Sequence, residues 1–328
     1  MLADLSSIFT RMAPYSFTGE QVSCALCGGD GHEIVGKRDR YGHRLTTVLC
    51  RGCGLVFTNP MPTQDEIDLY YRRHYRRHYH NAGAPRKKAL RRAADGARAR
   101  RALLYRMLVP DCRVLDVGSA EGAFVGLLHR EAIDAVGIEP NEGFADAARR
   151  RFGARFITTG WEHADFAAES FDLITAHHVL EHFRDPIGAL SRFRSWLKPD
   201  GRLYISVPDS PNPMRTPYAR FHFAHLYNFN HQSLVMAARK AGFEIEPSFA
   251  VHSTTLLFRK LALPPTDWLL FPDNYSTLTR FFREHTNLKY FLSSRPYGRW
   301  VRRMARLGRG MIEAQFAASS EAKPKGSG

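Results

Sequence analysis

The stretch VLDVGSAEG, residues 114–122, decides the fold of this chain. An apolar run over 112–117 leads into a glycine-rich turn, and residues with helical spacing follow at once. A unit of strand, turn and helix brings backbone N–H groups to the carboxyl end of a parallel strand, where open α/β sheets bind ligands. A dinucleotide site would need G-x-G-x-x-G, but alanines stand at the third and sixth positions from Gly118. The stretch therefore predicts an open α/β sheet with a ligand-binding turn of another kind.

The same alternation continues downstream and extends the predicted sheet. The second strand, over 134–139, ends at Glu139, 23 residues after Asp116. An acid at that place can accept hydrogen bonds from both hydroxyls of a ribose. Strands separated by helices predict a parallel sheet that is covered on both faces. The later strands are expected at 154–158, 171–176, 202–207, 243–249 and 252–259, the helices at 142–152, 186–197 and 231–241, and a turn at 198–201.

Four of the five cysteines form two C-x2-C pairs upstream of the sheet, with 22 residues between the pairs. One tight turn can present two thiolates to an ion, and two such turns complete a closed tetrahedral zinc site. Two disulfides are the alternative, but a chain without a secretion signal is expected in a reducing compartment. We predict structural zinc at Cys24, Cys27, Cys50 and Cys53, and a buried, unreactive thiol at Cys112.

Four segments in order resemble the motifs of class I S-adenosylmethionine (SAM) dependent methyltransferases: VLDVGSAEG, VGIEP, FDLITAHHVLEH and LKPDGRLYISVP. The cysteine-containing stretch before them looks like the zinc-binding module of a subset common among bacterial methyltransferases of sugars, polysaccharides and secondary metabolites. The resemblance implies an α/β fold, a doubly wound, Rossmann-like sheet of seven strands with a small N-terminal zinc-binding module. The expected organisation is an N-terminal segment (1–20), the zinc module (21–62), a basic helical linker (63–110), the SAM-binding domain (111–262) and a basic helical C-terminal extension with a disordered tail (263–328).

The resemblance also implies which residues bind SAM. The turn after the first strand would shape the pocket for the methionine part, and Ala120 stands where the family usually has its middle glycine. Glu139 would accept the ribose hydroxyls, and Trp161 would either pack against the adenine or belong to the core. The predicted SAM-binding residues are Asp116, Gly118, Ala120, Gly122, Glu139, Trp161 and His177.

Two histidine clusters offer a general base for methyl transfer to a hydroxyl. One follows the fourth strand (HHVLEH, 177–182), and the other precedes a helix (FHFAHLYNFNH, 221–231). The second resembles the EHL-x-YF segment of deoxysugar C-methyltransferases, where His225 aligns with the base but Ala224 replaces the glutamate. We therefore favour O-methylation with His225 as base, and a capping or packing role is its alternative. The candidate bases are His225, His182 and His178, and a divalent ion held by His178, Glu181 and His182 stays open.

The net charge of +15 is concentrated in two segments. Residues 72–106 hold 13 basic residues and one acid, residues 280–328 hold 11 and three, and the rest of the chain is mildly acidic. This distribution disfavours a uniformly basic groove for nucleic acid. Apolar residues over 90–108 recur at helical spacing, so the arginines of that helix are expected to stand outward. They would suit an anionic acceptor, and in related enzymes tyrosines at the places of Tyr71 and Tyr75 approach the substrate.

A second basic helix is predicted near the C-terminus. Trp300, Met304, Leu307 and Met311 recur with arginines between them. Such a basic amphipathic helix can lie on anionic lipid, or dock its apolar face on the domain. We therefore expect a cytoplasmic protein and keep a peripheral contact at the inner face of the membrane as an open alternative.

Length and composition agree with a soluble globular protein. The chain has 328 residues, of which 44% are hydrophobic and 24% charged, and no apolar run reaches the roughly 18 residues of a membrane helix. The sequence predicts a SAM-dependent methyltransferase with structural zinc that O-methylates a sugar, a glycan precursor or another small polar, anionic metabolite. The alternatives are an RNA methyltransferase and a noncatalytic zinc-ribbon binding protein with a degenerate SAM fold.

Overall fold

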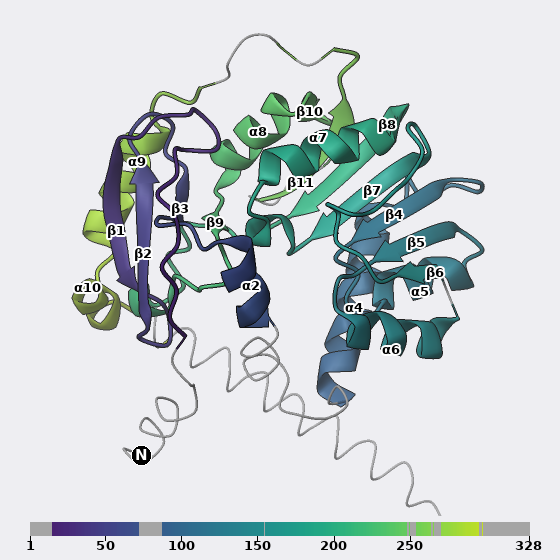
Figure 1. Ribbon diagram of the computed structural model, residues 1–328, viewed down its shortest axis with the longest axis horizontal. Coiled ribbons are helices and arrows are strands. Elements are labelled where there is room, and N and C mark those ends of the chain that lie inside the picture. Colours follow the sequence, from purple (N-terminus) through teal and green to yellow (C-terminus); the bar gives the residue numbers. More distant parts are fainter. Residues whose placement is uncertain are drawn as a thin grey trace, which may run out of the picture.

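The computed structural model describes residues 15–71, 87–153, 155–247, 249, 254–263, 265, 270–294 and 297. The larger part of the molecule is built on a sheet of seven strands (Figure 1). These strands are β4 (Arg113–Val117), β5 (Asp134–Ile138), β6 (Arg155–Ile157), β7 (Phe171–His177), β8 (Leu197–Ser206), β10 (Phe243–Ile245) and β11 (Thr255–Lys260).

The strand order β10-β11-β8-β7-β4-β5-β6 confirms the predicted seven-stranded sheet. The strands from β8 to β6 are parallel, whereas β11 is antiparallel to both β8 and β10. The first strand of this sheet in the chain, β4, lies in its middle. Strands β5 and β6 follow on one side of β4, and β7 then pairs with the other side of β4. The order therefore reverses beside β4, and ligands of open α/β sheets bind at the carboxyl edge of such a point.

Helices cover both faces of this sheet. Alternate residues of β4 face opposite cores, as a period of two requires: Val114 packs in the cluster with Phe124, and Leu115 packs in the cluster with Leu190. The predicted doubly wound arrangement is therefore confirmed. On one face lie α4 (Lys87–Leu103), α5 (Ala123–Arg130) and α6 (Glu142–Phe152), and on the other lie α7 (Pro186–Trp196) and α8 (His231–Lys240) (Figure 1).

The cysteine-containing region forms a second, antiparallel sheet of four strands in the order β1-β2-β3-β9. Its strands are β1 (His32–Arg38), β2 (Arg44–Cys50), β3 (Val56–Thr58) and β9 (Tyr227–Asn228). The last strand comes from the segment that follows β8, so Val56 pairs with Asn228 and Phe57 with Tyr227. The methyltransferase-like part thus completes the small sheet. Helix α2 (Gln64–Tyr70) lies between the two sheets, and α9 (Asn274–Glu284) and α10 (Asn287–Leu292) lie on the outer side of the small one (Figure 1).

Some predicted boundaries were wrong. The predicted turn at 198–201 lies inside β8, because Leu197 already pairs with Phe171 before a shift in register. For the segment HHVLEH, where a helix was only the condition for a metal site on His178, Glu181 and His182, the structure has a 3-10 turn at Leu180–His182. Three stretches lie outside the described residues: residues 1–14 of the predicted N-terminal segment (1–20), residues 72–86 with Tyr75, and the basic helix predicted around 300–311. Within the described part of the chain, no helix has the length and apolarity to cross a membrane.

Candidate active site

The turn after β4 is shaped by its glycines. Gly118 and Gly122 have φ angles of +69° and +73°, which L side chains rarely adopt. A Cβ on Gly118 would lie 2.7 Å from the Val179 side chain, and a Cβ on Gly122 would lie 2.4 Å from Phe156. Ala120 also has a positive φ, of +47°, at a strain of about 1–2 kcal/mol for a residue with a Cβ. The turn therefore has a fixed, tight shape, and Ala120 fits it without the glycine that the resemblance would place there.

Glu139 lies at the end of β5 and faces this turn. Its Oε2 accepts a hydrogen bond from the backbone N of Ala120 (3.0 Å), and its Oε1 accepts one from the backbone N of Asn141 (2.9 Å). Burial raises the pKa of the carboxyl to about 7, and the two backbone hydrogen bonds oppose that rise. Each oxygen retains a lone pair, so the carboxylate can also accept two ligand hydroxyls.

Asp116 is buried below the turn and has two partners. Thr175 Oγ1 donates to Asp116 Oδ1 (2.6 Å), and Arg100 Nη1 donates to the same oxygen (2.8 Å). The Arg100 guanidinium also lies 3.8 Å from the centre of the Phe124 ring. The expectation that the arginines of α4 stand outward is therefore wrong for Arg100, whose side chain is only 11% exposed. Sequence reasoning missed this residue because nothing in the helical pattern separates one arginine of the basic run from the next.

His177 and Trp161 lie in partly apolar surroundings. The His177 ring stacks on Tyr204 with centroids 6.2 Å apart, and burial, with the Arg100 charge as a smaller cause, lowers its pKa to about 3. The imidazole is therefore neutral at physiological pH. Trp161 packs against Phe183 with ring centroids 5.7 Å apart and against the core that α7 and α8 cover. Its indole nitrogen is buried and lacks a hydrogen-bond partner among the described residues, so both roles predicted for Trp161 stay open.

The two histidine clusters of the sequence meet in space. The rings of His182 and His225 lie edge to face with centroids 4.9 Å apart, and the His222 ring lies 5.3 Å from that of His225. His182 Nδ1 is 2.6 Å from the carbonyl oxygen of Ala224. A carbonyl oxygen only accepts, so in the neutral ring Nδ1 carries the proton and Nε2 carries the lone pair. The fold thus fixes the tautomer of His182 and leaves Nε2 able to accept a proton.

Glu181 supplies a buried carboxylate beside this basic nitrogen. Its Oε1 lies 3.8 Å from His182 Nε2, its side chain is 2% exposed, and neither carboxylate oxygen has a hydrogen-bond partner among the described residues. A buried carboxylate at that distance stabilises the imidazolium that forms when Nε2 takes up a proton. Glu181 and His182 therefore form a pair that can accept a proton and hold the resulting charge.

His225 and His178 differ from His182. Burial lowers the pKa of His225 well below its usual value, with His182 and His222 as further causes. His178 is half exposed, with Nδ1 3.8 Å from Glu181 Oε1, and its φ of +55° turns the chain sharply after β7. One ligand atom each from Glu181, His182 and His225 lies within 4.8 Å of the others, which is compatible with a metal ion. That group includes His225 in place of the His178 expected from the spacing.

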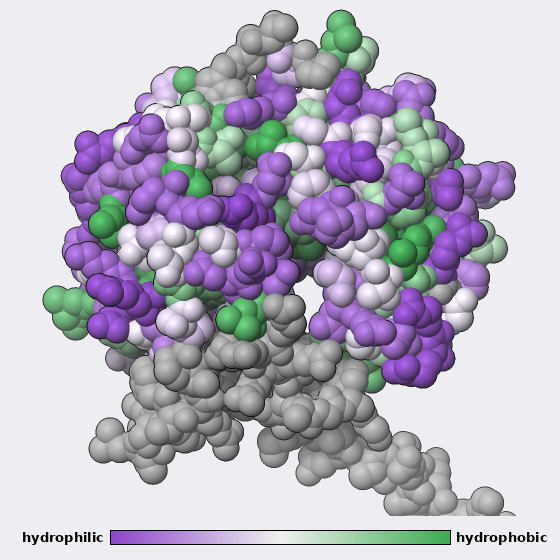
Figure 2. Space-filling view, in the orientation of Figure 1, coloured by the Kyte–Doolittle hydropathy of each residue, from purple (hydrophilic) through white to green (hydrophobic). Residues whose placement is uncertain are grey.

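Two tyrosines at the end of α2 contact the histidine cluster. The hydroxyl of Tyr71 lies 3.2 Å from His182 Nδ1, and the hydroxyl of Tyr70 lies 3.4 Å from His222 Nε2. Both tyrosines stand at the C-terminal end of α2, whose N-terminus is capped by Thr63. The space-filling view shows a hollow between the two parts of the molecule (Figure 2). The predicted approach of Tyr71 to the site has a structural basis, because this hydroxyl reaches a candidate base.

The four paired cysteines gather in a separate cluster at the small sheet. Cys24 Sγ lies 3.5 Å from Cys53 Sγ, Cys27 Sγ lies 3.4 Å from Cys50 Sγ, and all four sulfur atoms lie within 4.8 Å of one another. A tetrahedral zinc ion with Zn–S bonds of about 2.3 Å separates its sulfurs by about 3.8 Å, so the cluster fits that ion. The cluster is tied to the rest of the fold, because Asn274 Nδ2 donates to the Cys53 carbonyl (2.8 Å) and Lys240 Nζ to the Leu26 carbonyl (2.7 Å).

Comparison with known proteins identifies a matching family. Residues 70–248 match the model of a family described as a methyltransferase domain. The ubiquinone biosynthesis O-methyltransferase of Actinobacillus pleuropneumoniae serotype 7 (strain AP76) is 31% identical over 105 residues, which are 29% of this chain and 45% of that protein. The protein of the same name from Hahella chejuensis (strain KCTC 2396) is 33% identical over 108 residues, 31% of this chain and 45% of its own. The chain thus spans about half the length of these curated relatives.

Solved structures of similar shape are more distant in sequence. The 1,6-didemethyltoxoflavin-N1-methyltransferase of Burkholderia thailandensis, with 1,6-didemethyltoxoflavin and S-adenosylhomocysteine bound, is 21% identical with a TM-score of 0.46. That match covers 65% of this chain and 98% of the solved one. An S-adenosylmethionine dependent methyltransferase from Mesorhizobium loti is 17% identical with a TM-score of 0.41, over 51% of this chain and 100% of its own.

Proposed function

This chain belongs to the methyltransferase-domain family, which matches more than half of it, and we propose that it moves a methyl group from SAM to an oxygen atom of a small polar acceptor. The acceptor class that we favour is a sugar, a glycan precursor or a similar anionic metabolite. The observation that carries the proposal is the pair formed by Glu181 and His182 at the same sheet edge as the Gly118–Gly122 turn and Glu139. The turn and Glu139 provide a binding site for a nucleoside, and the pair of Glu181 and His182 provides a general base.

The residues around the turn fit the parts of SAM. The two oxygens of Glu139 each have a free lone pair for a ribose hydroxyl, and the positive-φ glycines hold the turn in the shape that brings the backbone N of Ala120 to Glu139. Arg100, held by Asp116 and Phe124, offers further N–H donors for a carboxylate such as that of methionine. When bound, SAM supplies a methyl group on a sulfonium, so the protein must mainly align an acceptor oxygen with that methyl.

We propose that His182 Nε2 removes the acceptor proton. The Ala224 carbonyl orients the ring and fixes its tautomer, and the Glu181 carboxylate stabilises the imidazolium. His225 remains the second candidate, but a positive charge on it is disfavoured first by burial and then by four neighbouring side chains: His182, His222, Arg40 and Arg215. We place His225 as a neutral ring against the acceptor, and His178, half exposed at the rim, as a contact for it.

A structural zinc ion on the four cysteines is also part of the proposal. Closed four-thiolate sites have no open position for substrate, so the ion would serve the fold. Because β9 pairs with β3, this ion would stabilise the segment between β8 and α8 that carries His222 and His225.

The proposal is tested by transfer of label from methyl-labelled SAM to separated pools of nucleotide sugars, lipid-linked glycans and RNA. We expect label in a small-molecule or glycan pool, lost when His182 is replaced by alanine. Label in RNA would support the RNA methyltransferase alternative. Failure of the intact protein to bind SAM would support the noncatalytic alternative and contradict the proposal.

A further inference from the structure

Helix α10 is anchored through one side and exposes apolar residues on the other. Tyr290 is buried, and its hydroxyl donates to the carbonyl oxygen of Met214 (3.3 Å). Asn287 Oδ1 accepts a hydrogen bond from the backbone N of Tyr218 (3.1 Å). The exposed apolar side chains of this helix are Leu288, Phe291 and Leu292, with exposed fractions of 70%, 52% and 78%.

These residues form one surface, which we call the α10 patch: Tyr218, Leu288, Phe291 and Leu292. The last three are spaced i, i+3 and i+4, so they share a side of the helix. Tyr218 is 54% exposed and is joined to the start of α10 by its backbone. Large apolar side chains that are exposed together mark a surface for a partner or a membrane. Figure 2 shows hydrophobic atoms protruding at the rim of the molecule where α10 lies in Figure 1.

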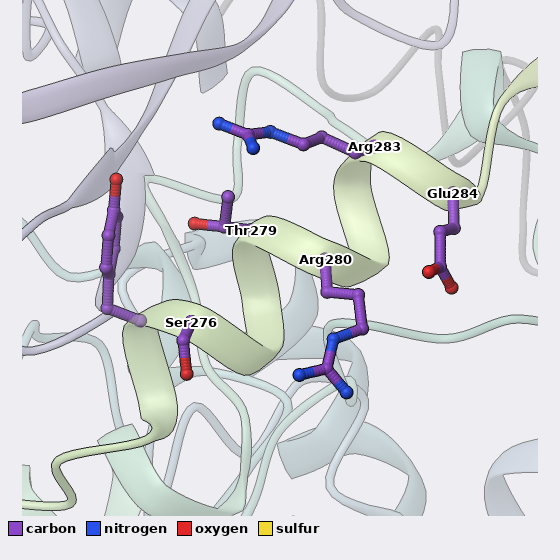
Figure 3. Close-up of a pocket in the computed structure, with 6 residues that line it drawn as sticks. Ser276, Thr279, Arg280, Arg283 and Glu284 are labelled. Atoms are coloured by element: carbon purple, nitrogen blue, oxygen red, sulfur yellow. The ribbon is translucent and has the colours of Figure 1, made fainter.

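The helix before the patch carries polar and basic side chains. An open cavity of about 480 Å³ on α9 is lined by Ser276, Thr279, Arg280 and Arg283, with Tyr275 and Glu284. Figure 3 shows the guanidinium groups of Arg280 and Arg283 extending away from the helix. Hydroxyl and guanidinium groups are suited to phosphate oxygens. Arg283 forms a long ion pair, with its Nη2 3.7 Å from Glu33 Oε1, and its side chain is 73% exposed.

The charge near the α10 patch distinguishes between two possible partners, a second copy of the chain and a membrane surface. Around the patch, residues 280–292 hold three basic residues, Arg280, Arg283 and Lys289, and one acid, Glu284. A dimer through this patch would bring two copies of these basic side chains together, and their repulsion opposes it. An anionic bilayer accepts apolar side chains and basic ones at the same surface.

We propose that the α10 patch docks on an anionic membrane surface, with Arg280 and Arg283 against the lipid headgroups. The inference goes beyond methyl transfer and stands or falls independently of it. It places apolar residues at the depth of the acyl boundary and basic residues among the phosphates, as in other interfacial helices.

Flotation of the full chain with lipid vesicles tests the proposal. We expect binding to vesicles of equal phosphatidylglycerol and phosphatidylcholine, and at least about tenfold weaker binding to phosphatidylcholine alone. The double variant Leu288→Asp/Leu292→Asp should bind the anionic vesicles at least about tenfold more weakly. Leu263→Asp/Leu270→Asp is the matched control, because both leucines are exposed, at 81% and 45%, and the charge change is the same.

Several outcomes would overturn the proposal. They are no binding of the wild type to anionic vesicles, equal binding to neutral ones, equal loss in both double variants, or a solution dimer that Leu288→Asp/Leu292→Asp dissociates. Arg280→Gln/Arg283→Gln is an independent variant, expected to weaken binding to anionic vesicles and to make the remainder less sensitive to salt. SAM binding and the melting temperature should be unchanged in every variant, which separates failure of docking from failure of the fold or of the proposed function.

Discussion

At the scale of single residues, the site depends on side chains whose charge the fold controls. Glu139 has a pKa raised to about 7 by burial, whereas burial keeps His177 and His225 neutral. His182 is different, because a carbonyl fixes its proton on Nδ1 and a buried carboxylate faces Nε2. These assignments give each group a distinct response to pH or substitution.

The affinity for SAM should depend on pH through Glu139. Ribose hydroxyls donate to a carboxylate, so the protonated carboxyl must lose its proton before it can accept from both. Below pH 7 we expect the dissociation constant of SAM to rise about tenfold per pH unit, and above pH 7 to be constant. Isothermal titration calorimetry between pH 5.5 and 8.5 measures this. Glu139→Gln should bind weakly with little dependence on pH, and an unchanged slope in that variant would assign the titration to another group.

Histidine variants should separate the base from its neighbour. His182→Ala should lower kcat by about 10²–10⁴-fold, because it removes the proton acceptor. His225→Ala should lower kcat less and raise KM, because a neutral ring against the acceptor mainly contributes binding. Steady-state kinetics with the identified acceptor, and SAM affinity as the control, check both. A larger loss of kcat in His225→Ala than in His182→Ala would identify His225 as the base.

At the scale of elements, the pairing of β9 with β3 joins the small, cysteine-containing sheet to the segment that carries His222 and His225. The sequence did not predict this pairing, because β9 has only two residues and an alternating pattern cannot be recognised from two positions. The turn predicted at 198–201 was wrong for a different reason, because these residues lie inside β8, whose pairing with β7 shifts in register between Phe171 and Leu173.

Loss of zinc should therefore impair both stability and activity. Cys27→Ser should abolish binding of one zinc ion per chain and lower the melting temperature by about 10 °C, because the binding energy of a structural ion is folding energy. Cys112→Ser is the control, since that thiol is buried at the start of β4 and lies outside the cluster. Metal analysis and thermal unfolding measure the two effects. Retained zinc in Cys27→Ser, or an equal shift in both variants, would contradict the four-cysteine site.

At the scale of the whole molecule, the sequence was most informative where a motif is local. The glycine turn, the alternating strands and helices, and the acid at the end of β5 were predictable because each depends on neighbouring residues. The meeting of His182 with His225, and the inward side chain of Arg100, depend on packing between distant segments. The charge distribution was also readable from the sequence, since the basic excess lies in two segments and the rest of the chain is mildly acidic.

The measurement that tests the central claim most directly is calorimetric titration of the full chain with SAM at pH 8. Glu139→Gln and Glu142→Gln remove the same charge three residues apart, and Glu142 is exposed at the start of α6. We predict one SAM per chain for the wild type, similar affinity for Glu142→Gln, and at least about tenfold weaker binding for Glu139→Gln. Absence of binding by the wild type, or equal affinity in all three proteins, would contradict the SAM site described here.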